Sequence, residues 1–257
     1  MKGFAEMVTI ELLSDLARRA GAITLQYFNT QLEIISKSDN SPVTIADRTT
    51  EEWLRAEIGR RFPDDGIVGE EFGTKEGSSG RRWILDPIDG TRSFIHGVPL
   101  YGVMIGVEKD GEMMGGAIYV PPLNELIVAV KGQGCFWNGR RAAVSTKSKL
   151  EDATVCTSDI MHHYEHNKGA GWDALCRRVA LVRTWGDCFG YMMVATGRAD
   201  VMLDAVMSPW DIAALQPILE EAGGRLTDYE GNTGIYGKDS IGSNGLLHDE
   251  VLKIVGG

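Results

Sequence analysis

The apolar residues at the start of the chain recur at helical spacing. A first helix is expected from apolar residues three or four positions apart, namely Val8, Leu12, Leu16, Ala20 and Ile23. A second helix is expected from Ile45 to Arg61, because the turn-forming segment 62–66 contains Pro63 and Gly66 and ends the helical pattern.

From residue 82 the pattern changes to that of strands. Residues 82–86 are mostly apolar and predict a short buried strand. The segments 101–107 and 113–120 flank an Asp110-Gly111 pair, which is typical of a β-hairpin turn. Another strand is expected at 125–131, so this part of the chain predicts a sheet.

A stretch rich in Lys, Ser and Thr at 145–149 predicts the boundary between two halves, 1–145 and 146–257. In the second half, strands are expected at 153–157, 181–184 and 201–205, and helices at 171–178, 191–196 and 212–222. This alternation indicates a mixed α/β (α+β) fold.

Composition and charge narrow the function classes. The chain has 257 residues, of which 43% are hydrophobic and 24% charged, and these are globular values. Lys and Arg number 26 against 36 Asp and Glu, which gives a net charge of −10. This acid excess argues against a nucleic-acid-binding module, which needs a basic surface.

The cysteines and the apolar runs indicate a cytoplasmic protein without a membrane partner. Cys135, Cys156, Cys176 and Cys188 form no C-x-x-C pair, and we expect them to be reduced and mostly buried. Acidic residues interrupt the N-terminal segment too early for a signal peptide, and no apolar run is long enough to span a membrane.

The most informative carboxylates are Asp86 and Asp89, which follow the strand expected at 82–86. Pro87 and Gly90 favour a sharp turn there, on which two carboxylates can converge. Carboxylate pairs of this kind bind hard cations such as Mg²⁺, Mn²⁺ or Ca²⁺. The alternative is a surface turn in which the aspartates bind only the backbone.

Three other acidic positions have equally simple structural explanations. Glu70 follows the apolar pair at 67–68, where it could be a solvated strand end. Asp211 lies at a helix start, where the helix dipole favours a negative charge. Thr44 and Asp47 have the spacing of a capping box.

Together these segments resemble the inositol monophosphatase superfamily of Mg²⁺-dependent, lithium-sensitive phosphatases. The matching segments, between Lys37 and Gly231, are GEE (69–71), DPIDGTRSF (86–94), ATGRAD (195–200), PWD (209–211) and EEAGG (220–224). The resemblance implies a layered α-β-α-β-α sandwich of the inositol monophosphatase and fructose-1,6-bisphosphatase type. It also implies a site between the two halves and a homodimer.

The resemblance implies a set of metal ligands. Glu70, Asp86 and the carbonyl of Ile88 would hold a first Mg²⁺, while Asp86, Asp89 and Asp211 would hold a second. A third, looser ion would lie near Glu70. We expect Mn²⁺ to substitute for Mg²⁺, and Li⁺ or Ca²⁺ to inhibit.

The resemblance also implies catalytic roles. Thr91, supported by Asp47 and with Glu70 nearby, would position and deprotonate the attacking water. The backbone N–H groups of Gly90 and Thr91 would bind phosphate oxygens. The expected reaction is hydrolysis of a small phosphate monoester by metal-activated water.

The second half favours one substrate. Its W-G-D-x-x-G-Y pattern at 185–191 and Ser93 are similar to the histidinol-phosphate phosphatase branch of the superfamily. Histidinol phosphate carries an ammonium and an imidazole, which carboxylates such as Asp187 and Asp204 would attract. The alternative for Asp187 is a buried ion pair with Arg183 that has no catalytic role.

The full set of residues expected to bind substrate is Gly90, Thr91, Ser158, Arg183, Asp187, Asp204 and Asp211. His162, His163 and His166 are expected in a solvated loop at the edge of the cleft and not in a metal site. The alternatives are an inositol-1-monophosphatase of broad specificity and a non-catalytic homologue that binds a metal or ligand. The non-catalytic alternative is disfavoured because the expected ligands and catalytic residues are intact, namely Glu70, Asp86, Asp89, Thr91 and Asp211.

Overall fold

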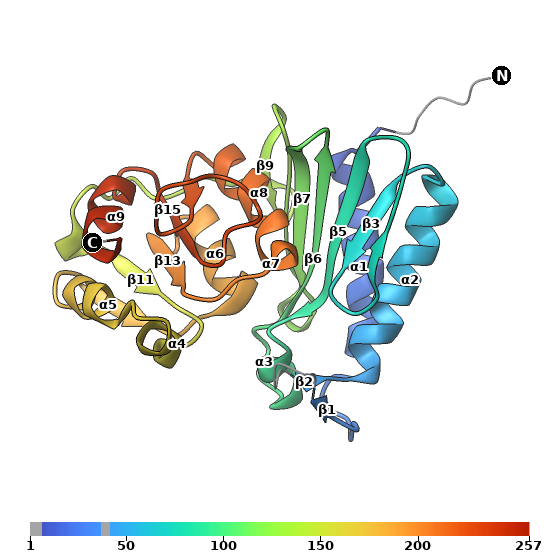
Figure 1. Ribbon diagram of the computed structural model, residues 1–257, viewed down its shortest axis with the longest axis horizontal. Helices are drawn as coiled ribbons and strands as arrows, with labels where there is room; N and C mark the ends of the chain where they lie inside the picture. Colours follow the sequence, from blue (N-terminus) through green and yellow to red (C-terminus); the bar gives the residue numbers. More distant parts are fainter. Residues whose placement is uncertain (1–6, 37–41, 257) are drawn as a thin grey trace.

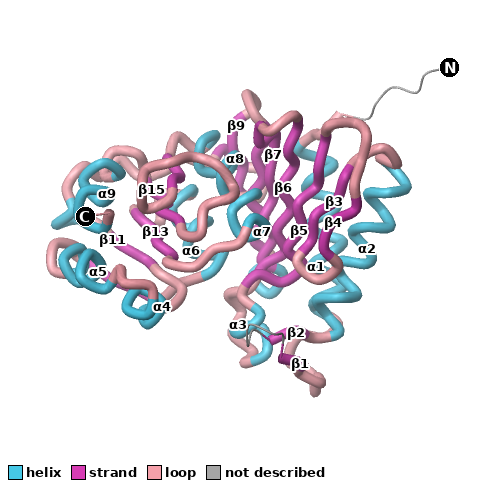
Figure 2. Tube along the Cα trace, viewed as in Figure 1, coloured by secondary structure: helices cyan, strands magenta, loops and turns pink. Residues whose placement is uncertain are grey.

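The computed structural model describes residues 7–36 and 42–256, so Lys37 lies outside the described residues. Two sheets stand side by side, with helices outside each of them and between them (Figure 1). Coloured by secondary structure, the two blocks of strands are separated by a layer of helices (Figure 2). The architecture is the α-β-α-β-α sandwich that the resemblance implies.

The first layer is a pair of helices, α1 (Ile10–Leu25) and α2 (Ile45–Arg61). Thr9 caps α1 by accepting a hydrogen bond from the backbone N–H of Leu12. Thr44 and Asp47 form the predicted capping box of α2. The apolar faces of both helices cover one face of the larger sheet, as their spacing predicts.

The larger sheet has eight strands in the order β10-β9-β8-β7-β6-β5-β3-β4. Their bounds are β3 (Gly66–Gly69), β4 (Gly73–Lys75), β5 (Arg81–Asp89), β6 (Gly102–Lys109), β7 (Glu112–Val120), β8 (Glu125–Val130), β9 (Gly134–Trp137) and β10 (Arg140–Arg141). The pairs are antiparallel except for β3 and β5, which run parallel. The register between β5 and β6 shifts between Asp86 and Asp89, at the end of β5.

The smaller sheet has five strands in the order β12-β11-β13-β15-β14. Their bounds are β11 (Thr154–Cys156), β12 (Leu181–Arg183), β13 (Val201–Asp204), β14 (Arg225–Thr227) and β15 (Ser240–Ser243). Helices α4 (Ile160–Glu165), α5 (Gly169–Cys176) and α9 (His248–Val255) lie on the outer side of this sheet (Figure 1). No helix in the described part of the chain is both long and apolar enough to cross a membrane.

Between the sheets lie α6 (Asp187–Ala195), α7 (Pro209–Ala213) and α8 (Leu215–Glu221). The remaining elements are α3 (Thr91–Ile95), the strands β1 (Ile35–Ser36) and β2 (Pro42–Val43), and short 3-10 helices at Pro121–Leu123 and Leu150–Asp152. The expected boundary at 145/146 falls in the segment between the last strand of the larger sheet and the first strand of the smaller one.

Two expectations from the sequence are corrected. The single helix expected at 212–222 is two helices, α7 and α8, with Pro217 in the first turn of α8. Proline has no N–H to donate to the carbonyl of the residue four positions earlier, here Ala213, and its ring clashes with that carbonyl. A continuous helix therefore cannot run from Ala213 through Pro217. The histidine segment is not a loop, because Asp159 caps the helix α4 there and His163 is buried.

The middle layer packs on the larger sheet at a pair of glycines. Gly106 of β6 and Gly116 of β7 face each other in register. A Cβ atom on Gly106 would lie 2.6 Å from Ala213 Cβ, and one on Gly116 would lie 2.4 Å from the Ala214 carbonyl oxygen. The backbone where α7 meets α8 therefore lies directly on the sheet, and this contact fixes the position of α7.

We expect Gly106→Ala to destabilise the fold by about 1–3 kcal/mol, because the added methyl group overpacks a rigid contact. Chemical denaturation would measure the change. The matched control is Gly59→Ala on α2, where the nearest atom to an added Cβ would be Lys75 Nζ at 4.0 Å. That substitution is expected to stabilise the helix by about 0.5–1 kcal/mol. Equal stability of the two variants would contradict the packing argument.

Candidate functional site

The site begins at the end of β5, where the strand delivers two carboxylates. Asp86 is buried, and its Oδ1 accepts a hydrogen bond of 3.0 Å from the backbone N–H of Ile88. Asp89 follows the register shift, and its Oδ2 accepts from the backbone N–H of Cys188 at the start of α6. This contact joins the larger sheet to the second half of the chain.

Asp211 approaches the same point from α7. Its Oδ2 accepts a hydrogen bond of 2.7 Å from the backbone N–H of Ser208 and completes a capping box, so the structural explanation for this residue holds. One oxygen from each of Asp86, Asp89 and Asp211 nevertheless lies within 4.8 Å of the other two. The aspartate of the second half therefore joins the pair from the first.

This carboxylate cluster fits a hard cation. The pKa of Asp89 is raised to about 7, mainly by burial and secondly by repulsion from Asp211. Burial is also the main cause that raises the pKa of Asp211 to about 7. The pKa of Asp86 is also raised, by burial and by Glu70. Within residues 7–36 and 42–256, no Lys, Arg or His forms an ion pair with these three aspartates. Oxygen ligands that repel one another are the donor set that Mg²⁺ prefers.

Glu70 lies beside the cluster because β3 runs parallel to β5. Its backbone N–H donates a 3.2 Å hydrogen bond to the carbonyl of Leu85. Its charge contributes to the raised pKa values of Asp86 and Asp211. The carbonyl of Ile88, the other ligand implied for the first ion, accepts a 3.0 Å hydrogen bond from Thr91 Oγ1.

Asp47 serves both the helix cap and the site, with a different oxygen for each. Its Oδ2 accepts from the backbone N–H and the hydroxyl of Thr44, at 2.8 and 2.7 Å. Its Oδ1 lies 3.4 Å from Thr91 Oγ1. Burial raises the pKa of Asp47 to about 6, against the lowering effect of the Thr44 hydrogen bonds. The carboxyl group can therefore exchange a proton near neutral pH.

Gly90 forms the turn between β5 and α3, with a φ of 83°. This left-handed conformation favours glycine. A Cβ atom here would also lie 2.9 Å from Asp187 Oδ2, so the carboxylate of Asp187 sits directly against the turn. The residues expected to bind phosphate and the residue expected to select the substrate are thus neighbours.

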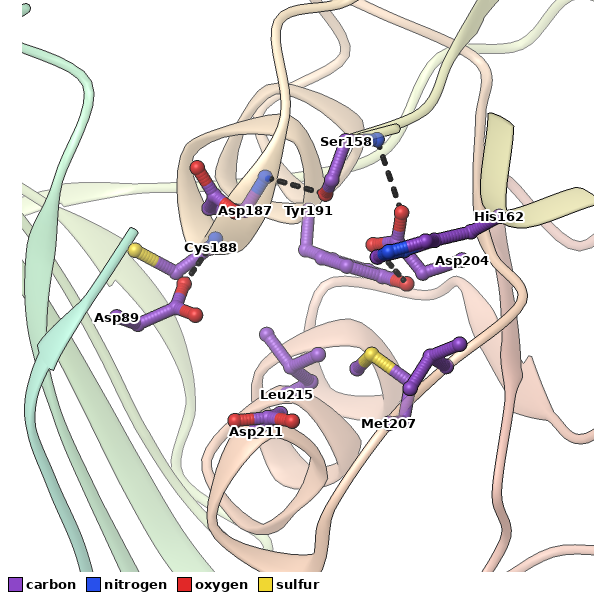
Figure 3. Close-up of a pocket in the computed structure, with 11 residues that line it drawn as sticks. Asp89, Ser158, His162, Asp187, Cys188, Tyr191, Asp204, Met207, Asp211 and Leu215 are labelled. Atoms are coloured by element: carbon purple, nitrogen blue, oxygen red, sulfur yellow. Dashed lines mark hydrogen bonds between the residues drawn. The ribbon is translucent and has the colours of Figure 1, made fainter. Parts of the chain in front are cut away.

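A cavity opens beside this turn and extends into the second half (Figure 3). Ser158 links two of the acidic residues that line the cavity. Its hydroxyl accepts a hydrogen bond from the backbone N–H of Asp187 at 2.7 Å, and its own backbone N–H donates one to Asp204 at 2.9 Å. Tyr191 donates to Asp204 at 3.1 Å. The hydroxyl of Ser93 lies 3.5 Å from Asp187 Oδ2. Ser93 and the 185–191 pattern that contains Asp187, the two features that favoured the histidinol-phosphate phosphatase branch, are therefore in contact.

Arg183 behaves differently from the other predicted residues. It is exposed, donates to the carbonyl of Val182, and does not line the cavity. In the described chain it forms no ion pair with Asp187, so that alternative is wrong. Burial, followed by the charge of Asp89, raises the pKa of Asp187 to about 7.

His162 was expected at the edge of the cleft and does line the cavity. The sequence did not predict the remaining cavity residues, which are Cys188, Tyr191, Val206, Met207 and Leu215. His162 points into the cavity from α4 (Figure 3). Its neighbour His163 anchors that helix by bonding Thr157 at 2.9 Å and stacking on Trp172 with ring centres 4.4 Å apart. The residue type at Asp159, which is common at helix N-caps, is the local feature of the sequence from which this helix could have been predicted.

Comparison with known proteins gives one consistent answer. The profile described as "Inositol monophosphatase family" matches residues 7–255. A histidinol-phosphatase of Chlorobaculum parvum is 46% identical over 96% of both chains. A fructose-1,6-bisphosphatase/inositol-1-monophosphatase of Thermotoga maritima is 37% identical over 97% of this chain and 96% of its own. Among solved structures, an IMPase of Thermotoga maritima superposes with a TM-score of 0.87, at 33% identity and 95% coverage of both chains.

The raised pKa values predict how the stability of the metal-free protein depends on pH. Asp89, Asp187, Asp204 and Asp211 have folded pKa values of about 7, above their unfolded values. The folded state therefore holds protons that the unfolded chain releases, and stability is lost as pH rises through 7. Between pH 6.5 and 8 we expect urea unfolding in a chelator to show a loss of at least about 1 kcal/mol.

Saturating Mg²⁺ is expected to reduce this loss, because an ion bound at the cluster would favour the ionised carboxylates. Asp211→Asn is the matched variant, since asparagine keeps the shape but does not titrate, and it should show a smaller loss. Metal-free protein that became more stable over the same range would contradict the proposed origin of these pKa values.

Proposed function

The chain belongs to the inositol monophosphatase family of Mg²⁺-dependent phosphoric monoester hydrolases, and on that premise we propose that it hydrolyses L-histidinol phosphate to L-histidinol and phosphate. The observation that carries the proposal is the 46% identity to a histidinol-phosphatase over 96% of both chains. The likeness to the fructose-1,6-bisphosphatase/inositol-1-monophosphatase is lower, at 37% over a similar length. This activity would be a step of histidine biosynthesis.

The proposal assigns the ions to the carboxylate cluster. Glu70, Asp86 and the Ile88 carbonyl would hold one Mg²⁺, with a third, looser ion near Glu70. A further Mg²⁺ would be held by Asp86, Asp89 and Asp211. The support for this assignment is that one carboxylate oxygen of each residue lies within 4.8 Å of the other two. When bound, Mg²⁺ neutralises the charge of the phosphate and favours ionisation of the attacking water.

Thr91 and Asp47 would handle the proton of that water. The Thr91 hydroxyl can accept this proton while passing its own to Asp47 Oδ1, 3.4 Å away. A pKa of about 6 makes Asp47 a better proton acceptor than an ordinary aspartate. Thr44 holds the other oxygen of Asp47, so the carboxylate keeps one orientation.

The cationic end of the substrate would lie in the cavity of the second half, with its phosphate on the backbone N–H groups of Gly90 and Thr91. Asp187 and Asp204 would face the ammonium and the imidazole, and Ser158 ties them together. A cation between them would offset the cost of burying two ionised carboxylates. Arg183 would reach substrate only from outside this cavity.

An inositol-1-monophosphatase of broad specificity is the second candidate. It is favoured by the Thermotoga maritima relative and by Ser158 and Asp204, which could equally bind the hydroxyl groups of inositol. We also propose that the site lies at the junction of the halves 1–145 and 146–257. The protein would be a cytoplasmic homodimer. Mn²⁺ would replace Mg²⁺, and Li⁺ or Ca²⁺ would inhibit.

A panel of phosphate esters tests the proposed substrate. Release of phosphate from histidinol phosphate, inositol-1-phosphate and fructose-1,6-bisphosphate would be measured in parallel, with and without Mg²⁺ and Li⁺. We expect Mg²⁺-dependent release with the highest kcat/KM on histidinol phosphate. A preference for inositol-1-phosphate would support the second candidate, and no Mg²⁺-dependent release would overturn both.

Asp187→Asn tests the basis of selectivity. Asp187 has a φ of 53°, which asparagine also tolerates, so the backbone should be unchanged. We expect kcat/KM on histidinol phosphate to fall by about 10- to 100-fold, since a charge-assisted contact of about 1.5–3 kcal/mol is lost. Activity on glycerol 2-phosphate, which carries no cation, should stay within about threefold. An equal loss on both substrates would refute the assignment of Asp187 to the cation.

A further inference from the structure

A buried carboxylate outside the site supports the turn that carries Glu70. Glu51 lies on α2 and is fully buried. Its Oε2 accepts a 2.7 Å hydrogen bond from the backbone N–H of Glu71, and its Oε1 accepts one of 3.2 Å from Phe72. Two consecutive backbone N–H groups, directly after Glu70, are therefore held by one side chain of another element.

The strand before this turn is shaped for the same carboxylate. A Cβ atom on Gly69 would lie 2.0 Å from Glu51 Oε1 and 2.8 Å from Oε2, so only glycine leaves room for the carboxylate. Gly69 also pairs with Leu85 of β5 and Gly73 of β4. The carboxylate of Glu51 thus lies against the backbone on both sides of Glu70.

Arg55, one helical turn further along α2, completes the arrangement. It donates to Glu51 Oε1 at 2.6 Å and also to the carbonyl of Gly73. The guanidinium group compensates the buried charge and attaches the far end of the turn to the same helix. Residues 69–73 are therefore fastened to α2 at both ends.

We propose that Glu51 is a positioning residue, which sets the backbone of residues 69–72 so that Glu70 meets the carboxylate cluster ready to bind Mg²⁺. The inference rests on the proposed role of Glu70 as a metal ligand. Glu51 touches neither the cluster nor the cavity among the described contacts, so its effect would pass through the turn. Its removal would leave two backbone N–H groups without their acceptor and let the turn relax.

The test is Mg²⁺ binding by calorimetry to Glu51→Gln, together with thermal unfolding of the metal-free protein. Glutamine keeps the volume but presents an NH₂ group to a backbone N–H. We expect the Kd for Mg²⁺ to rise at least about fivefold, because a change of that size corresponds to the loss of roughly one good hydrogen bond. The Mg²⁺ concentration needed for half-maximal phosphatase activity should rise in parallel, with kcat at saturating Mg²⁺ changing less.

Asp65→Asn is the matched control. Asp65 is a buried carboxylate at the opposite end of β3, where it accepts hydrogen bonds from Ser79, Arg81 and Trp83. Its loss should lower the melting temperature but keep the Kd for Mg²⁺ within about twofold. If both variants weakened Mg²⁺ binding alike, Glu51 would be merely structural and the inference would be wrong.

Two further variants keep the test informative if Glu51→Gln folds poorly. Gly69→Ala displaces the carboxylate without changing its charge and should raise the Kd in the same direction. In a Glu70→Gln background, Glu51→Gln should add little, because both act through one ligand. Unchanged Mg²⁺ binding in Glu70→Gln would refute the proposed ligand. A normal Kd in Glu51→Gln, beside a raised one in Glu70→Gln, would refute the present inference alone.

Discussion

The site depends on holding mutually repelling carboxylates close together in a partly buried cleft. Without a cation, this arrangement is unfavourable, since burial and repulsion both oppose ionisation of Asp86, Asp89 and Asp211. The fold opposes that repulsion with contacts made elsewhere. The backbone N–H of Ile88 holds Asp86, and that of Cys188 holds Asp89. The cap of α7 and the packing of the middle layer on the larger sheet both fix Asp211.

Two of the acidic residues show that a structural explanation and a functional one can both be correct. Asp47 and Asp211 each occupy the third helical position of a capping box. The capping box was predicted for Asp47, whereas for Asp211 only a place at a helix start was expected. In each case one oxygen binds the backbone before the helix. The other oxygen of Asp47 faces Thr91, and Asp211 also offers an oxygen to the cluster. The cap orients the carboxylate, so the two roles support each other.

The sequence predicted those parts of the molecule that local patterns determine. The bounds of α2 and the Asp110-Gly111 hairpin follow from capping, periodicity and turn chemistry. The roles of the carboxylates were predicted from the resemblance of several short motifs, taken together, to one family, since each motif alone had a structural explanation. The strands β14 and β15 were missed, since three or four residues in a mixed sheet carry too little periodicity. The orientation of α4 depends on His163 and Trp172, and the surroundings of Asp187 depend on Ser93, which is distant in the chain. Such contacts exist only after folding.

The glycine pair at Gly106 and Gly116 has a consequence for how the site responds to motion. Where a helix rests on a sheet through long side chains, rotamer changes can alter the spacing between them. At these two glycines the sheet meets the backbone and Cβ atoms of Ala213 and Ala214, so no long side chain separates the sheet from the end of the helix that bears Asp211. The distance between Asp211 and the pair Asp86 and Asp89 should therefore change little when side chains elsewhere change rotamer.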